Sequence, residues 1–164
     1  LRRLQRFIAN FDLCRDLIAR LIFDLLPEKT NLKLVIDRTN WKFGTQNINI
    51  FMLGIAYRGV AFPLLFSLLD KRGNSNCEER IQLVNRFIRL FGIDCIDCIM
   101  ADREFVGEKW IGFLNNLNLR YYIRIRNNFK VFLPNKGRTI PVKWLFSGLK
   151  VELEISKSEI RSKP

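Results

Sequence analysis

The sequence contains no histidine, and this absence excludes several kinds of active site. Ser-His and Cys-His nucleophile pairs, histidine general bases and histidine metal ligands all require an imidazole. Any hydrolytic or transfer chemistry in this chain must therefore use carboxylates, and a hard metal ion is their expected partner.

The sequence also lacks any apolar run approaching the roughly 20 residues that a membrane-spanning helix needs. Its N-terminus lacks the charged, apolar and small-residue order of a signal peptide. Apolar residues still make up 48% of the 164 residues, enough for the core of one ordinary domain. We therefore expect a soluble cytoplasmic protein with no membrane partner. Because the chain begins at Leu1 rather than Met, we also expect it to be a fragment.

Cysteine is scarce, with four residues in the chain. Cys95 and Cys98 form one CxxC pair, a spacing found at zinc and redox sites. The sequence offers neither a second CxxC pair nor a histidine to complete four ligands. Buried apolar thiols are the favoured interpretation, and a metal or redox site is the alternative.

Acidic residues are few relative to basic ones. The chain has 28 Lys and Arg against 16 Asp and Glu, a net charge of +12, and no Asp or Glu between Lys109 and Lys150. Such an excess favours a polyanionic partner through phosphate contacts and counterion release. A solvated basic surface is the alternative, but the long stretch of one sign favours nucleic acid.

Hydrophobic periodicity predicts an alternation of strands and helices. We expect, in chain order, helical segments within 1–26, strands at 32–36, 46–57 and 60–69, a helix ending at Gly92, a strand at 95–101, a helix at 106–117, an alternating strand in LRYYIRIRN and shorter β segments after 128.

Three local signals refine these elements. Arg58 and Gly59 are expected to form a two-residue hairpin turn, with glycine supplying a positive φ. Pro63 indicates an edge strand or a bulge. Ser75, followed three residues later by Glu78, resembles a capping box at the start of the first long helix after the strands.

The order of three strands, helix, strand, helix and strand predicts an α/β ribonuclease H-like fold, a mixed sheet with flanking helices. A strand–helix–strand crossover permits parallel pairing of the later strands with the first. Asp37 and Asp102 would then face each other at matching strand ends. Alone, each is typical of a strand end or turn, and Asp102 also of a helix cap. Together they indicate a site for two ions ~3.5–4 Å apart, as in phosphodiester displacement.

Two motifs carry a resemblance to a known family. IDRTNWKFG, with Asp37, and ADREF, with Asp102, resemble the first two acidic motifs of DDE transposases of the IS-four insertion-sequence type. The intervening GVAFPLLFSLLDKRGNSN is similar to that family's segment, and the resemblance covers about 1–150. It implies an N-terminal helical segment (1–29), a ribonuclease H-like catalytic core (30–128) and the start of a β-rich insertion (129–164), which is truncated.

The resemblance implies that Asp37 and Asp102 are the catalytic carboxylates, binding Mg²⁺ or Mn²⁺ in a two-ion site. It also implies double-stranded DNA at element ends and target as partner, a homodimer on paired ends, no small-molecule cofactor, and a bacterial, nucleoid-associated location. Trp41 is expected in the substrate groove or in the core, and Arg103 is either a DNA contact or an ordinary surface residue. The expected DNA-binding residues are Arg38, Lys42, Arg103, Arg120, Arg124 and Arg126.

The sequence departs from the family at the third acid, a glutamate in a helix with a Tyr, Arg, Glu and Lys pattern. Glu104 and Glu108 lie too close to Asp102, and Glu152, Glu154 and Glu159 lack the flanking residues. We therefore expect a truncated transposase. The alternatives are a non-catalytic DNA-binding remnant, a ribonuclease H-like nuclease that uses Glu104 or Glu108, and, last, a purely structural domain.

Overall fold

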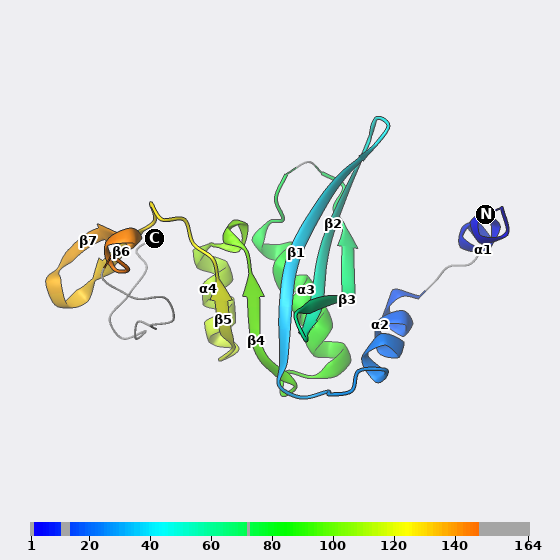
Figure 1. Ribbon diagram of the computed structural model, residues 1–164, viewed down its shortest axis with the longest axis horizontal. Helices are drawn as coiled ribbons and strands as arrows, with labels where there is room; N and C mark the ends of the chain where they lie inside the picture. The colour runs from blue at the N-terminus through cyan, green and yellow to red at the C-terminus, as the bar shows by residue number, and fades with distance from the viewer. Residues whose placement is uncertain (1, 11–13, 72, 148–164) are drawn as a thin grey trace. The chain divides into compact units, whose positions relative to one another are not determined.

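The fold is organised around a five-stranded mixed sheet with strand order β3-β2-β1-β4-β5 (Figure 1). The structure, a computed structural model, describes residues 2–10, 14–71 and 73–147. The first three strands pair antiparallel, whereas the last two run parallel to β1. This topology confirms the predicted ribonuclease H-like mixed sheet. The strands are β1 (Leu32–Phe43), β2 (Gln46–Tyr57), β3 (Val60–Leu68), β4 (Ile96–Ala101) and β5 (Arg120–Ile123).

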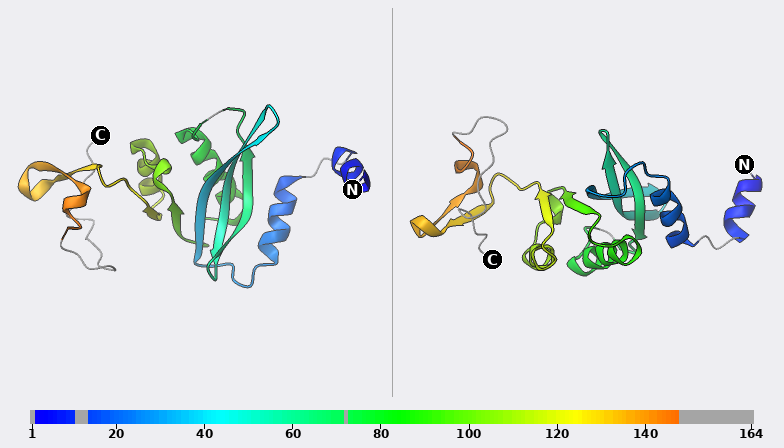
Figure 2. Two further views of the ribbon diagram at one scale, coloured as in Figure 1. Left: turned by 45° about the horizontal axis from the view of Figure 1, so that its top comes forward. Right: turned by 90° about the horizontal axis from the view of Figure 1, so that it is seen from below.

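Two helices, α3 (Cys77–Phe91) and α4 (Glu108–Asn116), lie on the same face of this sheet (Figure 2). Their buried side chains join those of the strands in one apolar core, in which Trp110 and Phe87 are fully buried. α2 (Arg15–Asp24) packs against β3, and its Phe23 ring stacks on that of Phe91 at 4.2 Å. α1 (Arg2–Asn10) precedes it in the chain. Within the described ranges, no helix is long and apolar enough to cross a membrane.

β1 is longer than the expected strand at 32–36. It continues to Phe43 because its antiparallel pairing with β2 extends to the hairpin, where Phe43 is opposite Gln46. The parallel pairing with β4, in contrast, ends at Ile36 and Ala101. Asp37 therefore lies within β1, at the point where its parallel neighbour stops.

The β2–β3 hairpin has the expected turn and the expected irregularity. Arg58 and Gly59 have φ values of 48° and 81°, the positive values of a type I′ turn. Pro63 lies in the edge strand of the sheet, next to a register shift between Leu53 and Gly54. Both interpretations of Pro63, edge strand and bulge, are therefore confirmed.

The capping box at the start of α3 is shifted by one residue from the expected Ser75 and Glu78. Asn76 is the N-cap; its side chain accepts from the Glu79 backbone N–H at 2.8 Å, while the Glu79 carboxylate accepts from the Asn76 N–H at 2.7 Å. The helix ends at Gly92, as predicted, with a φ of 88°.

Two later elements are shorter than expected. A 3₁₀ turn, η1 (Arg103–Phe105), follows β4, so α4 begins at Glu108 rather than near 106. β5 stops at Ile123, so the alternation of LRYYIRIRN is not continued as strand through Arg126.

The chain divides into two compact units, residues 1–123 and 124–164. In the second unit, β6 (Lys130–Leu133) and β7 (Arg138–Pro141) form an antiparallel hairpin joined by η2 (Pro134–Lys136) and followed by η3 (Val142–Trp144). The expected KVELEI segment, with Glu152, Glu154 and Glu159, lies outside the described residues.

Candidate active site

The two aspartates singled out by the sequence directly follow a pair of register partners in the sheet. Ile36 and Ala101 are register partners in the parallel β1–β4 pair, and Asp37 and Asp102 are the next residue in each segment. Neighbouring strands lie about 4.8 Å apart. Partnered residues share a face and successive residues alternate. Since Ile36 and Ala101 are buried in the core, the two aspartates lie on the opposite, exposed face.

The two aspartates differ in their backbone setting. Asp37 belongs to β1, and its carboxylate accepts a hydrogen bond from the backbone N–H of Arg38 at 2.7 Å. Asp102 has extended backbone (φ −80°, ψ 173°), and its carbonyl accepts from the N–H of Phe105 at 3.0 Å as η1 begins. The Asp102 side chain makes no capping hydrogen bond, and the N-cap of α4 is Gly107. Helix capping therefore does not account for Asp102.

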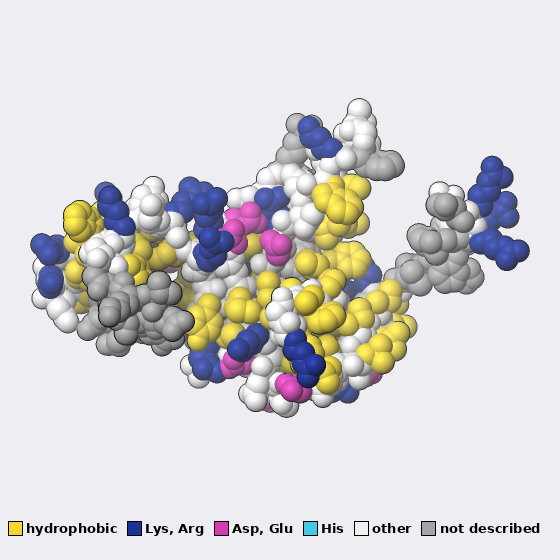
Figure 3. Space-filling view, in the orientation of Figure 1, with side chains coloured by type: hydrophobic (Ala, Val, Ile, Leu, Met, Phe, Trp, Pro, Cys, Tyr) yellow, Lys and Arg dark blue, Asp and Glu magenta, His cyan; other side chains and the backbone are white. Residues whose placement is uncertain are grey.

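The donor set of the pair suits a hard divalent cation. Carboxylate oxygens are the ligands that Mg²⁺ prefers, and Mg²⁺ commonly uses one or two carboxylates together with water and substrate phosphate. Acidic side chains gather over the end of β4 and the adjoining part of β1 (Figure 3). In the part of the chain that the structure describes, no group of three His, Cys, Asp or Glu residues could share one ion. Asp37 and Asp102 are thus two exposed carboxylates on neighbouring segments, without a third acid grouped with them among the described residues.

Arg38, predicted to contact DNA, is held beside the pair by Glu104. Its Nε and Nη2 donate to the two oxygens of the Glu104 carboxylate at 3.0 and 3.1 Å, and Nη2 also donates to Asn74 Oδ1 at 3.1 Å. The Arg38 and Glu104 side chains are only 13% and 24% exposed. Because both carboxylate oxygens of Glu104 accept from Arg38, this arrangement disfavours Glu104 as a third metal ligand.

Asn49, which the sequence interpretation did not single out, supports Arg38 from β2. It is 2% exposed, and its Oδ1 accepts from Arg38 Nη1 at 3.5 Å. Its Nδ2 donates to the carbonyls of Lys71 and Gly73, each at 3.0 Å. The sequence did contain a signal for Asn49, which is a polar residue inside the apolar strand NINIFML. Because a buried amide needs hydrogen-bond partners, such a residue is expected to bind other polar groups.

Arg80 is a second buried cation that the sequence interpretation missed. Its Nε donates to Ser75 Oγ at 3.0 Å, and its Nη2 donates to the carbonyls of Ser75 and Glu104 at 2.7 and 3.1 Å. The guanidinium also lies over the Phe105 ring, 5.1 Å from its centroid. Burial lowers the pKa of Arg80, while the charges of Cys77, Glu104 and Glu79 oppose this shift. Arg80 thus ties the start of α3 to the turn that follows Asp102.

The other predicted DNA-binding residues belong to different segments of the chain. Lys42 is exposed in β1 near the β1–β2 turn, and Arg103 is exposed directly after Asp102. Arg120 begins β5 and pairs with Asp97. Arg124 and Arg126 are exposed and belong to the second unit.

The exposure of Trp41 and the burial of the CxxC pair bear on the alternative interpretations given for each. Trp41 is 63% exposed, so it is not a core residue. Cys95 and Cys98 are buried free thiols, and burial raises the pKa of each. They match the interpretation of buried apolar cysteines.

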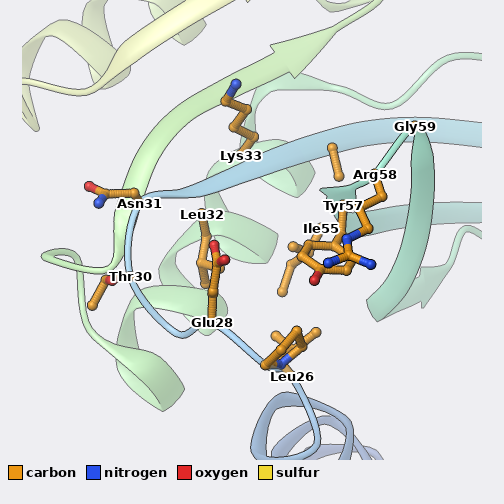
Figure 4. Close-up of a pocket in the computed structure, with 12 residues that line it drawn as sticks. Leu26, Glu28, Thr30, Asn31, Leu32, Lys33, Ile55, Tyr57, Arg58 and Gly59 are labelled. Atoms are coloured by element: carbon orange, nitrogen blue, oxygen red, sulfur yellow. The ribbon is translucent and has the colours of Figure 1, made fainter.

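A pocket of about 420 Å³ lies where β1 begins and β2 ends (Figure 4), and neither Asp37 nor Asp102 lines it. Glu28 and Thr30, from the connection between α2 and β1, line it together with Tyr57 and Arg58 of the β2–β3 hairpin. The Arg58 guanidinium lies over the Tyr57 ring at 5.2 Å. Glu28 is the sole carboxylate among the residues that line the pocket, so the pocket does not repeat the pair of acids formed by Asp37 and Asp102.

Comparisons with known proteins find similar structures and no similar sequence family. No protein-family model matches the chain, and no curated protein matches it. The magnesium complex of the HTLV-2 integrase catalytic core domain in its dimeric form is 17% identical, with a TM-score of 0.44, over 57% of this chain and 61% of that one. The simian T-cell lymphotropic virus intasome with PP2A regulatory subunit B56 gamma is 16% identical, with a TM-score of 0.46, over 62% of this chain and 36% of that one. The large terminase of a thermophilic bacteriophage is 18% identical, with a TM-score of 0.39, over 62% of this chain and 24% of that one.

The chain thus spans less than two thirds of each of these structures.

Proposed function

We propose that this chain is part of the catalytic domain of a DDE transposase of the IS-four type, with Asp37 and Asp102 as its metal-binding carboxylates. One observation carries the proposal: two exposed aspartates, 65 residues apart in sequence, each directly follow one member of the Ile36–Ala101 register pair of β1 and β4. The ribonuclease H-like strand order and the net charge of +12 support the same function.

In this proposal, Asp37 and Asp102 hold Mg²⁺ or Mn²⁺, two ions in the complete site. When bound, such ions supply Lewis-acid stabilisation of the oxygens of a phosphodiester. Double-stranded DNA at element ends and target is the proposed substrate, and a homodimer on paired ends the proposed assembly. The exposed cations Lys42 and Arg103, with Arg120, Arg124 and Arg126, would contact phosphates, which position DNA without reading its sequence.

Metal binding tests the proposal directly. Mn²⁺ titration of the 164-residue protein, followed by electron paramagnetic resonance, measures the free ion. We expect Asp37→Asn and Asp102→Asn each to weaken Mn²⁺ binding by at least tenfold, because each removes one of two charged ligands. Asp94→Asn is the matched control, since Asp94 is an exposed aspartate just before the start of β4, whereas Asp102 follows its end. Equal Mn²⁺ affinity in all four proteins would refute the proposed site.

A DNA-binding protein without cleavage is the second candidate function. It is favoured by the absence, among residues 2–10, 14–71 and 73–147, of a third acid that could share an ion with the pair. Nicking of supercoiled plasmid in Mn²⁺ separates the two candidates, with the Asp37→Asn protein as control. Binding of duplex DNA that weakens steeply with salt, without nicking by the wild-type protein, would favour the second candidate.

A further inference from the structure

We infer that Arg38 and Glu104 act as positioning residues that hold Asp37 and Asp102 in place for metal binding, an inference that rests on the proposed function. Arg38 directly follows Asp37 in β1, and Glu104 lies two residues after Asp102 in η1. The two hydrogen bonds between their side chains therefore join the two segments that carry the aspartates.

The geometry of the pair favours a rigid connection. Two parallel N–H···O bonds between a guanidinium and a carboxylate fix orientation as well as distance. The side chains are 13% and 24% exposed, so removing one partner leaves a largely buried charge without its ion-pair partner. An exposed ion pair, in contrast, contributes little.

Further contacts anchor each member of the pair. Arg38 also contacts Asn49, which in turn holds the carbonyls of Lys71 and Gly73 in the loop before α3. Glu104 is held through its own carbonyl, which accepts from the buried Arg80 of α3. The pair is thus braced by β2, by this loop and by α3, and residues that orient metal ligands affect metal affinity strongly.

Charge gives the pair a second consequence. An uncompensated guanidinium beside Asp37 would repel a divalent cation, and Glu104 neutralises it. A purely electrostatic role would make the two neutral variants act in opposite directions: Arg38→Gln would strengthen cation binding and Glu104→Gln would weaken it. A positioning role makes both variants weaken it.

The experiment is a double-mutant cycle of Mn²⁺ affinity with Arg38→Gln, Glu104→Gln and the double variant. We expect each single variant to bind Mn²⁺ about tenfold more weakly, and the double variant to be no weaker than either, because both changes remove the same connection. The matched control is Arg86→Gln. Arg86 makes a similarly part-buried ion pair with Asp16, between α3 and α2, and its loss should leave Mn²⁺ affinity unchanged.

Amide hydrogen exchange of the metal-free proteins provides a second readout. Peptides covering 100–105 should exchange faster in Arg38→Gln and Glu104→Gln, and at the wild-type rate in Arg86→Gln. Additive losses of affinity, tighter binding by Arg38→Gln, a loss confined to Glu104→Gln, or unchanged exchange would each overturn the inference. If wild-type Mn²⁺ binding does not depend on Asp37 and Asp102, the proposed function fails instead, while exchange still decides whether the pair holds the segment after β4.

Discussion

Gly54, in β2, is expected to accept a side chain only at a cost in stability. A Cβ built at this position would lie 2.7 Å from the carbonyl oxygen of Phe62 and 3.2 Å from its carbonyl carbon, both in the backbone of β3. Real Cβ contacts almost never fall below 3.0 Å. Gly54 also adjoins the register shift between β2 and β3, where the two strands approach irregularly. Relief of the contact would therefore require movement of strand backbone rather than of a flexible side chain.

Gly54→Ala should lower the free energy of unfolding by about 1–2 kcal/mol. An extra methyl group in a packed region costs roughly 1–3 kcal/mol, and the loss of glycine's freedom in the unfolded chain offsets about 0.5–1 kcal/mol of it. Urea unfolding followed by circular dichroism measures the difference. Gly112→Ala in α4 is the matched control, because a Cβ there meets no atom within 4 Å. That variant should gain up to about 1 kcal/mol, since alanine favours helix.

The stabilities of the two variants must be compared to test the close approach of β2 and β3. If Gly54→Ala is as stable as the wild-type protein while Gly112→Ala gains stability, the close approach of β2 and β3 does not exist as described. A loss of stability in both variants would show that the effect belongs to glycine replacement in general and not to this contact.

Two further predictions concern α3 and the buried thiols. Asn76→Ala should cost about 1 kcal/mol of stability in urea unfolding, because it removes the side-chain cap of α3; an unchanged midpoint would contradict the observed cap. Burial raises the pKa of Cys95 and Cys98 above the ordinary 9.0, so the folded state retains these protons longer than the unfolded state. The contribution of these thiols to stability is therefore complete below pH 9.0 and is lost as the pH rises through the folded-state pKa. Urea unfolding between about pH 7 and 10 measures this loss of stability, and the loss should be smaller in Cys98→Ala.

Much of the fold could be predicted from local patterns. The bounds of β2, the turn at Arg58 and Gly59, and the end of α3 at Gly92 all follow from periodicity and glycine placement. The capping box was displaced by one residue because Ser75 and Asn76 are both good caps, and the buried Arg80 engages Ser75. The extension of β1 to Phe43 depends on its partner strand, which local periodicity does not encode.

For the candidate site, the sequence by itself determined the two carboxylates, the absence of imidazole and the excess of positive charge. Tertiary structure alone decided the setting of Arg38. The motif that it shares with Asp37 predicted a residue that contacts DNA. Its partner Glu104, however, lies 66 positions away in sequence and is brought near by the parallel pairing of β1 and β4. A residue's type and its local spacing fix which contacts it can make; the fold selects among them, because hydrogen bonds and contact ion pairs form over a few ångströms of space and not along the chain.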